Sequence, residues 1–95
     1  MSFWFYMLSC VDGSYYVGHT DDLERRLAEH QTGAFGGYTS TRLPVVLEFA
    51  QEFPTRDDAI CRERQVKNWS KGKKKALAAG NWVQLSWLAR GRDRE

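Results

Sequence analysis

The chain has 95 residues, of which 42% are hydrophobic and 14% aromatic, and its formal net charge is +2. This composition excludes a disordered chain and predicts one small folded domain over residues 1–90, followed by a polar tail at 91–95. No apolar run is long enough to cross a membrane, and Cys10 and Cys61 lack the spacing of a zinc site, so we expect a cytoplasmic protein with free thiols.

Charge is distributed unevenly along the chain. Three arginines accompany six acidic residues through Glu48, whereas eleven lysines and arginines accompany six acidic residues from Phe49 onward. Much of this surplus lies between Arg62 and Lys75. A basic stripe of this kind suits a polyanionic partner, although ordinary solvated helices produce the same asymmetry.

The N-terminal segment predicts a β-hairpin. Residues 3–10 are almost all apolar or aromatic, which indicates a strand covered on both faces. The Asp-Gly pair at 12–13 is typical of a tight hairpin turn, so the chain should return as a second strand over residues 15–18.

A short helix should follow the hairpin. Asp21 is suited to the N-cap position and Glu24, three residues later, completes a capping box, which predicts a helix over residues 22–30. Gly33 fits a glycine just beyond its C-terminus. Residues 32–43, rich in glycine and hydroxyl groups, are expected to form a loop.

The C-terminal half predicts one strand and then helices. Pro44 precedes a third strand, in which alternation should place four side chains on one face: Val45, Leu47, Phe49 and Phe53. Thr55 should cap the next helix, which should break at residues 70–72 before a short lysine-rich helix that Gly80 ends. Trp82, Leu85 and Leu88 predict a last short helix.

Helical geometry directs two charged side chains of the first helix toward the core. At about 100° per residue, Arg26 and His30 flank the apolar stripe of Leu23 and Leu27, whereas Arg25 lies on the opposite side. Arg25 should therefore face water, and the helix should carry Arg26 and His30 into its buried edge.

A carboxylate on the second helix lies inside its apolar arc. Glu63 shares that arc with Ala59 and Val66, where an isolated buried charge would be too costly, so it must be paired, metal-bound or protonated. One interpretation is a structural Arg26–Glu63 ion pair with His30 as an ordinary core histidine. The other is that all three residues belong to a reaction site.

The spacing of these residues resembles that of the GIY-YIG nuclease family, particularly its small stand-alone bacterial members. Tyr16 lies ten positions after Tyr6, Arg26 ten positions after Tyr16, and His30 four positions after Arg26. The strand segments are WFY at 4–6 and YVG at 16–18, and an Asp-Ala-x-x-x-Glu element ends at Glu63. The resemblance covers the chain from Trp4 to about Trp82.

The resemblance implies an α+β fold with a three-stranded antiparallel sheet flanked by helices, and metal-dependent cleavage of DNA phosphodiester bonds with Mg²⁺ or Mn²⁺. The catalytic residues it implies are Tyr6, Tyr16, Arg26 and His30, with Glu63 as the metal ligand and Gly18 as the motif glycine. His19 and Asn68 are implied as accessory residues. DNA repair or processing is the expected context.

This chemistry suits the residue types. Negative charge develops on the phosphate oxygens during attack, and an arginine and a divalent cation both stabilise it. Magnesium keeps several waters, so one carboxylate, Glu63, suffices as a protein ligand. A tyrosine whose pKa is lowered by Arg26 and the metal, or else His30, would accept the proton of the attacking water.

The chain departs from the family pattern in three places. Trp4 and Phe5 stand where the motif has glycine and isoleucine, a change that we attribute to strand packing. A late asparagine has no clean match, leaving Asn68 and Asn81 as candidates. The loop at 32–43 carries only Arg42 as a basic residue, which predicts weak DNA binding.

Basic and aromatic side chains are candidates for DNA contact, with solvation or packing as the alternative. The basic candidates are Arg42, Lys67, Lys71, Lys73 and Lys74. Tyr15 and Tyr38 either stack on bases or pack locally. We expect a monomer or weak dimer that selects DNA by structure and not by sequence. A catalytically weak DNA-binding module on the same fold is the alternative to a nuclease.

Overall fold

The computed structural model describes residues 2–80. Its elements are β1 (Phe3–Ser9), β2 (Tyr15–Thr20), α1 (Leu23–Thr32), the 3₁₀ helix η1 (Gly37–Thr41), β3 (Val46–Phe53), α2 (Arg56–Lys67) and α3 (Lys71–Ala78). Their order is the predicted one, except that the segment expected to form a loop, 32–43, contains η1. The α+β fold class with a three-stranded antiparallel sheet is confirmed. The helix and tail expected beyond residue 80 lie outside the described residues.

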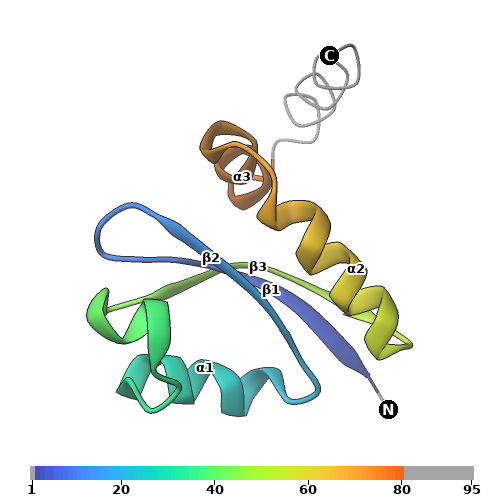
Figure 1. Cartoon of the computed structure of the whole chain (residues 1–95), viewed down its shortest axis with the longest axis horizontal. Coiled ribbons are helices and arrows are strands. Elements are labelled where there is room, and N and C mark those ends of the chain that lie inside the picture. The colour runs from blue at the N-terminus through green and yellow to red at the C-terminus, as the bar shows by residue number, and fades with distance from the viewer. Residues whose placement is uncertain (1, 81–95) are drawn as a thin grey trace.

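The sheet has the order β2-β1-β3, so β1 lies in the middle and β2 forms one edge. Helix α1 covers one face of the sheet, and α2 with α3 covers the other (Figure 1). Both partners of β1 run antiparallel to it, and Tyr6 of β1 lies opposite Gly18 of β2. Because β2 is an edge strand, side chains from both faces of the sheet can reach it.

Alternation along β1 divides the core into two clusters. Phe5 and Met7 pack toward α2 and α3, where Val66 and Leu77 are buried against them. Tyr6 and Leu8 point to the opposite face, toward α1. All four β1 side chains have no exposed surface. The prediction of a strand covered on both faces is therefore confirmed.

Helix α1 begins one residue later than predicted. Asp22, and not Asp21, is the N-cap, and its carboxylate accepts a hydrogen bond from the backbone N–H of Arg25 at 3.1 Å. Strand β2 continues to Thr20, whose hydroxyl accepts a hydrogen bond from the N–H of Asp22 and so delays the first helical turn. Gly33 ends the helix with φ 78°, as predicted, because this left-handed conformation favours glycine.

Helix α2 has the predicted cap, and α3 has a hydroxyl cap of the same kind that was not predicted. The Thr55 hydroxyl accepts a hydrogen bond from the N–H of Asp58 at 3.2 Å, and α2 ends at Lys67. Ser70 then caps α3 through the N–H of Lys73, also at 3.2 Å. The predicted break near residues 70–72 is confirmed, and it allows α3 to fold back onto the sheet and bury Leu77.

The prediction for β3 was wrong in one respect. Its four apolar residues do not share a face, because the pairing with β1 shifts between Met7 and Leu8 and leaves Glu48 as an extra residue. Such a bulge reverses the alternation of the strand. Val45 therefore packs with the α1 cluster, Phe49 packs with the α2 cluster, and Leu47 remains 39% exposed.

Both cysteines are free, as predicted; Cys10 is buried and Cys61 is exposed. Among residues 2–80, no helix combines the length and the apolar character needed to cross a bilayer.

Candidate active site

The predicted site residues gather at the open edge of the sheet, around β2. Arg26 comes from α1 and Glu63 from α2, and these helices lie on opposite faces of the sheet. The two side chains nevertheless reach the same β2 residue. Arg26 Nη1 donates to the backbone carbonyl of His19 at 3.4 Å, and Glu63 Oε1 lies 2.7 Å from His19 Nδ1.

A buried chain of hydrogen bonds anchors the first motif tyrosine. The Tyr6 hydroxyl lies 2.9 Å from His30 Nε2, and His30 Nδ1 lies 2.7 Å from the Thr39 hydroxyl. Tyr6 and His30 have no exposed surface and Thr39 only 1%. These groups satisfy one another, so they fix the orientation of the Tyr6 ring; His30 is buried away from solvent.

Gly18 permits the close packing of Tyr6 against β2. A Cβ atom placed on Gly18 would lie 2.6 Å from the Tyr6 hydroxyl oxygen and 2.7 Å from Cζ of that ring. Both distances are shorter than real side-chain contacts. Any other residue at position 18 would therefore displace Tyr6 or the strand.

Arg26 lies at the rim of the site, with 24% of its side chain exposed. Its Nε pairs with Glu29 Oε1 at 3.2 Å, and its guanidinium lies 4.6 Å from the centre of the Phe35 ring. Glu63 pairs instead with His19. The structural Arg26–Glu63 ion pair considered from the sequence is thus replaced by two separate pairs.

Glu63 is the best-placed residue to hold a cation. Its carboxylate is 20% exposed, and one oxygen is engaged by His19, whose side chain is 30% exposed. Across residues 2–80, no cluster of three or more histidine, cysteine or acidic side chains could enclose a metal. This donor set is unsuited to a closed zinc site but fits Mg²⁺, which accepts one carboxylate and fills its remaining positions with water and phosphate oxygens.

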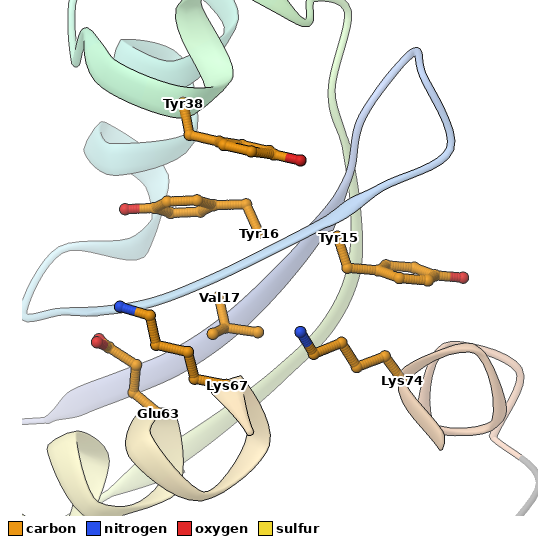
Figure 2. Close-up of a pocket in the computed structure, with 7 residues that line it drawn as sticks. All are labelled: Tyr15, Tyr16, Val17, Tyr38, Glu63, Lys67 and Lys74. Carbon is orange, nitrogen blue, oxygen red and sulfur yellow. The ribbon is translucent and has the colours of Figure 1, made fainter. Parts of the chain in front are cut away.

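A cavity of about 370 Å³ opens beside β2 (Figure 2). Tyr16 and Tyr38 lie on one side of it, and the α2 side chains of Glu63 and Lys67 on the other. Lys74 reaches in from α3. Tyr15 and Val17 complete the lining. The second motif tyrosine and the candidate metal ligand thus share one opening that is large enough for a small ligand.

Burial keeps the site tyrosines neutral. Desolvation raises the pKa of Tyr6 above its usual value, and the nearby Arg26 charge opposes this only in part. The pKa of Tyr16 is also raised, first by burial and second by the Glu63 carboxylate. Arg26 lowers the pKa of both tyrosines, but desolvation outweighs it; the net lowering expected from Arg26 and a bound metal together stays a prediction.

The pKa of His30 is lowered, by burial first and by the charge of Arg26 second. A neutral imidazole can accept a hydrogen bond at one nitrogen and donate at the other. This state matches its two contacts, with the hydroxyls of Tyr6 and Thr39. His30 is thus suited to hold Tyr6 and poorly placed to take a proton from water.

The structure places the basic residues proposed for DNA contact in different environments. Lys67 and Lys74 line the cavity, and Lys71 lines a neighbouring one with Lys74. Lys73 is only 6% exposed, and its ammonium lies 4.1 Å from the Trp69 ring centre, so the prediction that it faces DNA was wrong. Lys73 is buried because it lies on the side of α3 that faces the rest of the protein.

Arg42 is also engaged within the protein. Its Nε pairs with Asp12 Oδ2 at 3.0 Å, and its guanidinium lies 3.8 Å from the centre of the Tyr38 ring. Arg42 is thus paired with Asp12, and its contact with a DNA phosphate stays a prediction. Asn68 ends α2, where its side chain donates to the Arg64 carbonyl; Asn81 lies outside the described residues.

Three residues around the site were not singled out from the sequence: Thr39, Glu29 and Phe35. Thr39 fixes His30, Glu29 pairs with Arg26, and Phe35 packs 4.4 Å from the His30 ring, centre to centre. Glu29 lies three residues after Arg26 on the same helix, a spacing at which side chains can pair, so its contact with Arg26 was predictable from the sequence. Thr39 and Phe35 follow α1 in a segment without hydrophobic periodicity, which gave no such signal.

Comparison with known proteins identifies clear relatives. The chain is 42% identical over 72 residues to a UPF0213 protein of Halobacterium salinarum, covering 76% of this chain and 94% of the relative. It is also 42% identical over 76 residues to a UPF0213 protein of Streptococcus pneumoniae, covering 80% and 77%.

Solved structures of similar proteins have the same fold. The solution structure of UPF0213 protein BH0048 from Bacillus halodurans matches with a TM-score of 0.55 at 37% identity, covering 85% of this chain and 86% of that one. Protein EF2693 from E. faecalis matches with a TM-score of 0.57, also at 37% identity, over 84% and 85%. The family model for the GIY-YIG catalytic domain matches residues 2–76. This chain therefore belongs to the GIY-YIG catalytic domain family.

Proposed function

We propose that this protein hydrolyses phosphodiester bonds in DNA with the help of a divalent cation, Mg²⁺ or Mn²⁺. One observation carries the proposal: Tyr16, Glu63 and two lysines line a single cavity at the β2 edge, and Arg26 reaches that edge from the opposite face of the sheet. A carboxylate for a cation, cationic groups for phosphate and a phenol are thus within one small region.

Arg26 is assigned to stabilise the charge that develops on phosphate. Its side chain is three-quarters buried between Phe35 and the β2 edge, so its charge acts in a medium that screens less than water. Its guanidinium is already held by Glu29 and by the His19 carbonyl. A fixed donor of this kind needs little reorganisation when the reaction occurs.

The two tyrosines have different assignments. Tyr6 is fully buried, so it acts as a positioning residue that supports the site through His30. Tyr16 lines the cavity, and its phenol is neutral at physiological pH; burial raises its pKa further above that range. A neutral phenol is a hydrogen-bond donor, which suits contact with a phosphate oxygen or with the attacking water.

Glu63 would hold the cation, with water and substrate phosphate as the other ligands. When bound, the cation supplies Lewis-acid stabilisation of the phosphate charge and a lower pKa for a coordinated water. His19 beside Glu63 orients the carboxylate, as partners of metal ligands commonly do.

The proposal is tested by incubating the protein with labelled single strands, duplexes, flaps and branched DNA in Mg²⁺ or Mn²⁺, with EDTA as control. We expect metal-dependent cleavage that Glu63→Gln removes. Glu52→Gln is the matched control, because Glu52 is exposed on β3 and lies outside the cavity. Cleavage that survives Glu63→Gln, or that EDTA leaves unchanged, would refute the assignment.

A second candidate is a DNA-binding module without turnover. The observation that favours it is the 2.7 Å contact between His19 and Glu63, which occupies one carboxylate oxygen. If this pair is permanent, Glu63 has only its second oxygen left for a cation, and binding of the cation is weakened. Binding of DNA with no cleavage of any substrate, and identical binding in Mg²⁺ and EDTA, would support this candidate over the nuclease.

A further inference from the structure

Two neighbouring cavities lie beside β2, and together they are called the depression here. The cavity of about 370 Å³ beside Glu63 and a second of about 250 Å³ near the hairpin turn have Tyr15 and Lys74 in common. The depression is therefore lined by Glu63 and by three lysines, Lys67, Lys71 and Lys74. It combines aromatic and cationic side chains, which is the combination that single-stranded nucleic acids require.

The aromatic side of the depression is held in place. Tyr38 is 41% exposed, yet its ring lies 6.3 Å from that of Tyr16 with only 22° between their planes. The guanidinium of Arg42 lies over the Tyr38 ring at 3.8 Å, and its Nη1 donates to the Tyr38 carbonyl at 2.8 Å. Arg42 is thus a positioning residue for Tyr38. A ring fixed before binding loses little entropy when a ligand stacks on it.

The cationic side favours an anion between two lysines. Lys67 and Lys74 both reach into the cavity, and Figure 2 shows their ammonium groups directed toward the space below Tyr16 and Tyr15. The pKa of Lys74 is lowered, first by burial and second by the charge of Lys67. A phosphate placed between the two ammonium groups would relieve this repulsion.

We propose that this depression binds an unpaired nucleotide of a DNA strand, with its base among the three tyrosines that line the cavity, Tyr15, Tyr16 and Tyr38, and its phosphate between Lys67 and Lys74. The inference rests on the proposed function, since it names the substrate class of the same site. Bases in an intact duplex stack on each other and expose no face to a protein ring. An unpaired nucleotide avoids the free energy needed to extrude a base from a duplex.

Binding can be measured without cleavage. Fluorescence anisotropy in EDTA compares a labelled oligothymidylate with a labelled hairpin duplex that has the same number of phosphates. We expect the wild-type chain to bind the single strand more tightly than the duplex. Equal affinity, or preference for the duplex, would overturn the inference.

Variants locate the binding in the depression. Tyr38→Leu should weaken single-strand binding by about 5- to 150-fold, the range for loss of one base–aromatic stack, whereas Tyr38→Phe keeps the ring and should retain most of the affinity. Lys74→Gln should reduce the slope of log affinity against log salt by about 0.7. Lys75→Gln is the charge-matched control, because Lys75 is exposed on α3 and lies outside both cavities.

The outcomes separate this inference from the proposed function. Single-strand binding that depends on Tyr38 and Lys74, in a protein that cleaves nothing, would retain the inference and reject the nuclease. Cleavage of duplex and single strand at equal rates, unaffected by Tyr38→Leu, would retain the nuclease and reject the inference. Thermal melts of each variant identify any loss of affinity that arises from unfolding. If Tyr38→Leu is unfolded, the affinities of Tyr38→Phe and Lys74→Gln determine whether the depression binds the single strand.

Discussion

Replacing Gly18 by alanine tests whether the Tyr6 packing is as tight as the structure indicates. The new methyl group would lie 2.6 Å from the Tyr6 hydroxyl oxygen and 3.1 Å from Cε2 of the same ring. Tyr6 cannot move freely, because its ring is fully buried and its hydroxyl contacts His30 at 2.9 Å. Either the β2 backbone shifts or Tyr6 leaves its position.

The expected loss of stability follows from two contributions. Overpacking of a buried site commonly costs about 1–3 kcal/mol. Displacing the Tyr6 hydroxyl would leave His30 Nε2 without its buried partner, which costs a further 1–3 kcal/mol or so. We therefore expect the free energy of unfolding to fall by about 2–6 kcal/mol, and the melting temperature by at least about 8 °C for a domain of this size.

The measurement is a thermal melt and a urea titration of Gly18→Ala beside Gly72→Ala. Gly72 lies in α3 without a positive φ, and a methyl group there would meet no neighbouring side chain or strand within 4 Å. Alanine at position 72 should therefore stabilise the helix by up to about 1 kcal/mol. If the two variants melt at the same temperature, the close approach of Tyr6 to β2 does not constrain the fold, and the reasoning fails.

Four further outcomes are expected. Arg26→Ala should reduce the cleavage rate by about 10²- to 10³-fold, the usual effect of removing one transition-state donor, measured by single-turnover kinetics on the best substrate. Glu63→Gln should abolish metal-dependent cleavage yet melt close to wild type, because its pair with His19 is partly exposed; a loss of stability as large as that of a stranded buried charge would contradict this. Because the pKa of His30 is lowered in the folded state, the unfolded chain binds the proton more tightly, so stability should fall as pH drops below about 6.5, measured by urea titrations at several pH values; no such fall would show that His30 is not desolvated. Lys67→Gln should flatten the salt dependence of DNA affinity, and an unchanged slope would place this lysine outside the phosphate path.

The ends of helices were predicted well where residues close in sequence determine them. They were predicted less well where the pairing of strands determines where an element ends. The cap at Thr55 and the end of α1 at Gly33 depend on side chains within a few residues, and both agree with expectation. The N-cap was misplaced by one residue because Asp21 and Asp22 are equally good caps, and the length of β2 decides between them. A capping pattern carries no information about strand length.

The bulge in β3 illustrates the same limit. Alternation of apolar residues assumes that each residue of one strand faces one residue of its partner. Glu48 is the extra residue, and its carboxylate accepts a hydrogen bond from the Ser9 hydroxyl at 2.7 Å. A contact between residues 9 and 48 is invisible to any local pattern, so the reversal after Leu47 was not predictable.

For the candidate site, helix periodicity was the useful signal. It separated Arg26 and His30 from Arg25, whose side chain is 63% exposed, and it placed Glu63 toward the sheet. Charge alone does not distinguish the lysines of α3 in the same way. Lys73 is buried while Lys75 is exposed, a difference that follows from their positions around the helix and not from their charge.

The partners of Arg26 and Glu63 bear on the choice between a structural ion pair and a reaction site. A buried Arg26–Glu63 pair would have explained both residues without any chemistry, because each would neutralise the other. Instead Arg26 is balanced by Glu29 and Glu63 is partnered by His19, with both contacts partly open to solvent. Pairs of this kind contribute little to stability. Folding alone therefore gives little reason for placing a guanidinium and a carboxylate on either side of one strand, whereas the binding of a cation and a phosphate at the β2 edge requires both.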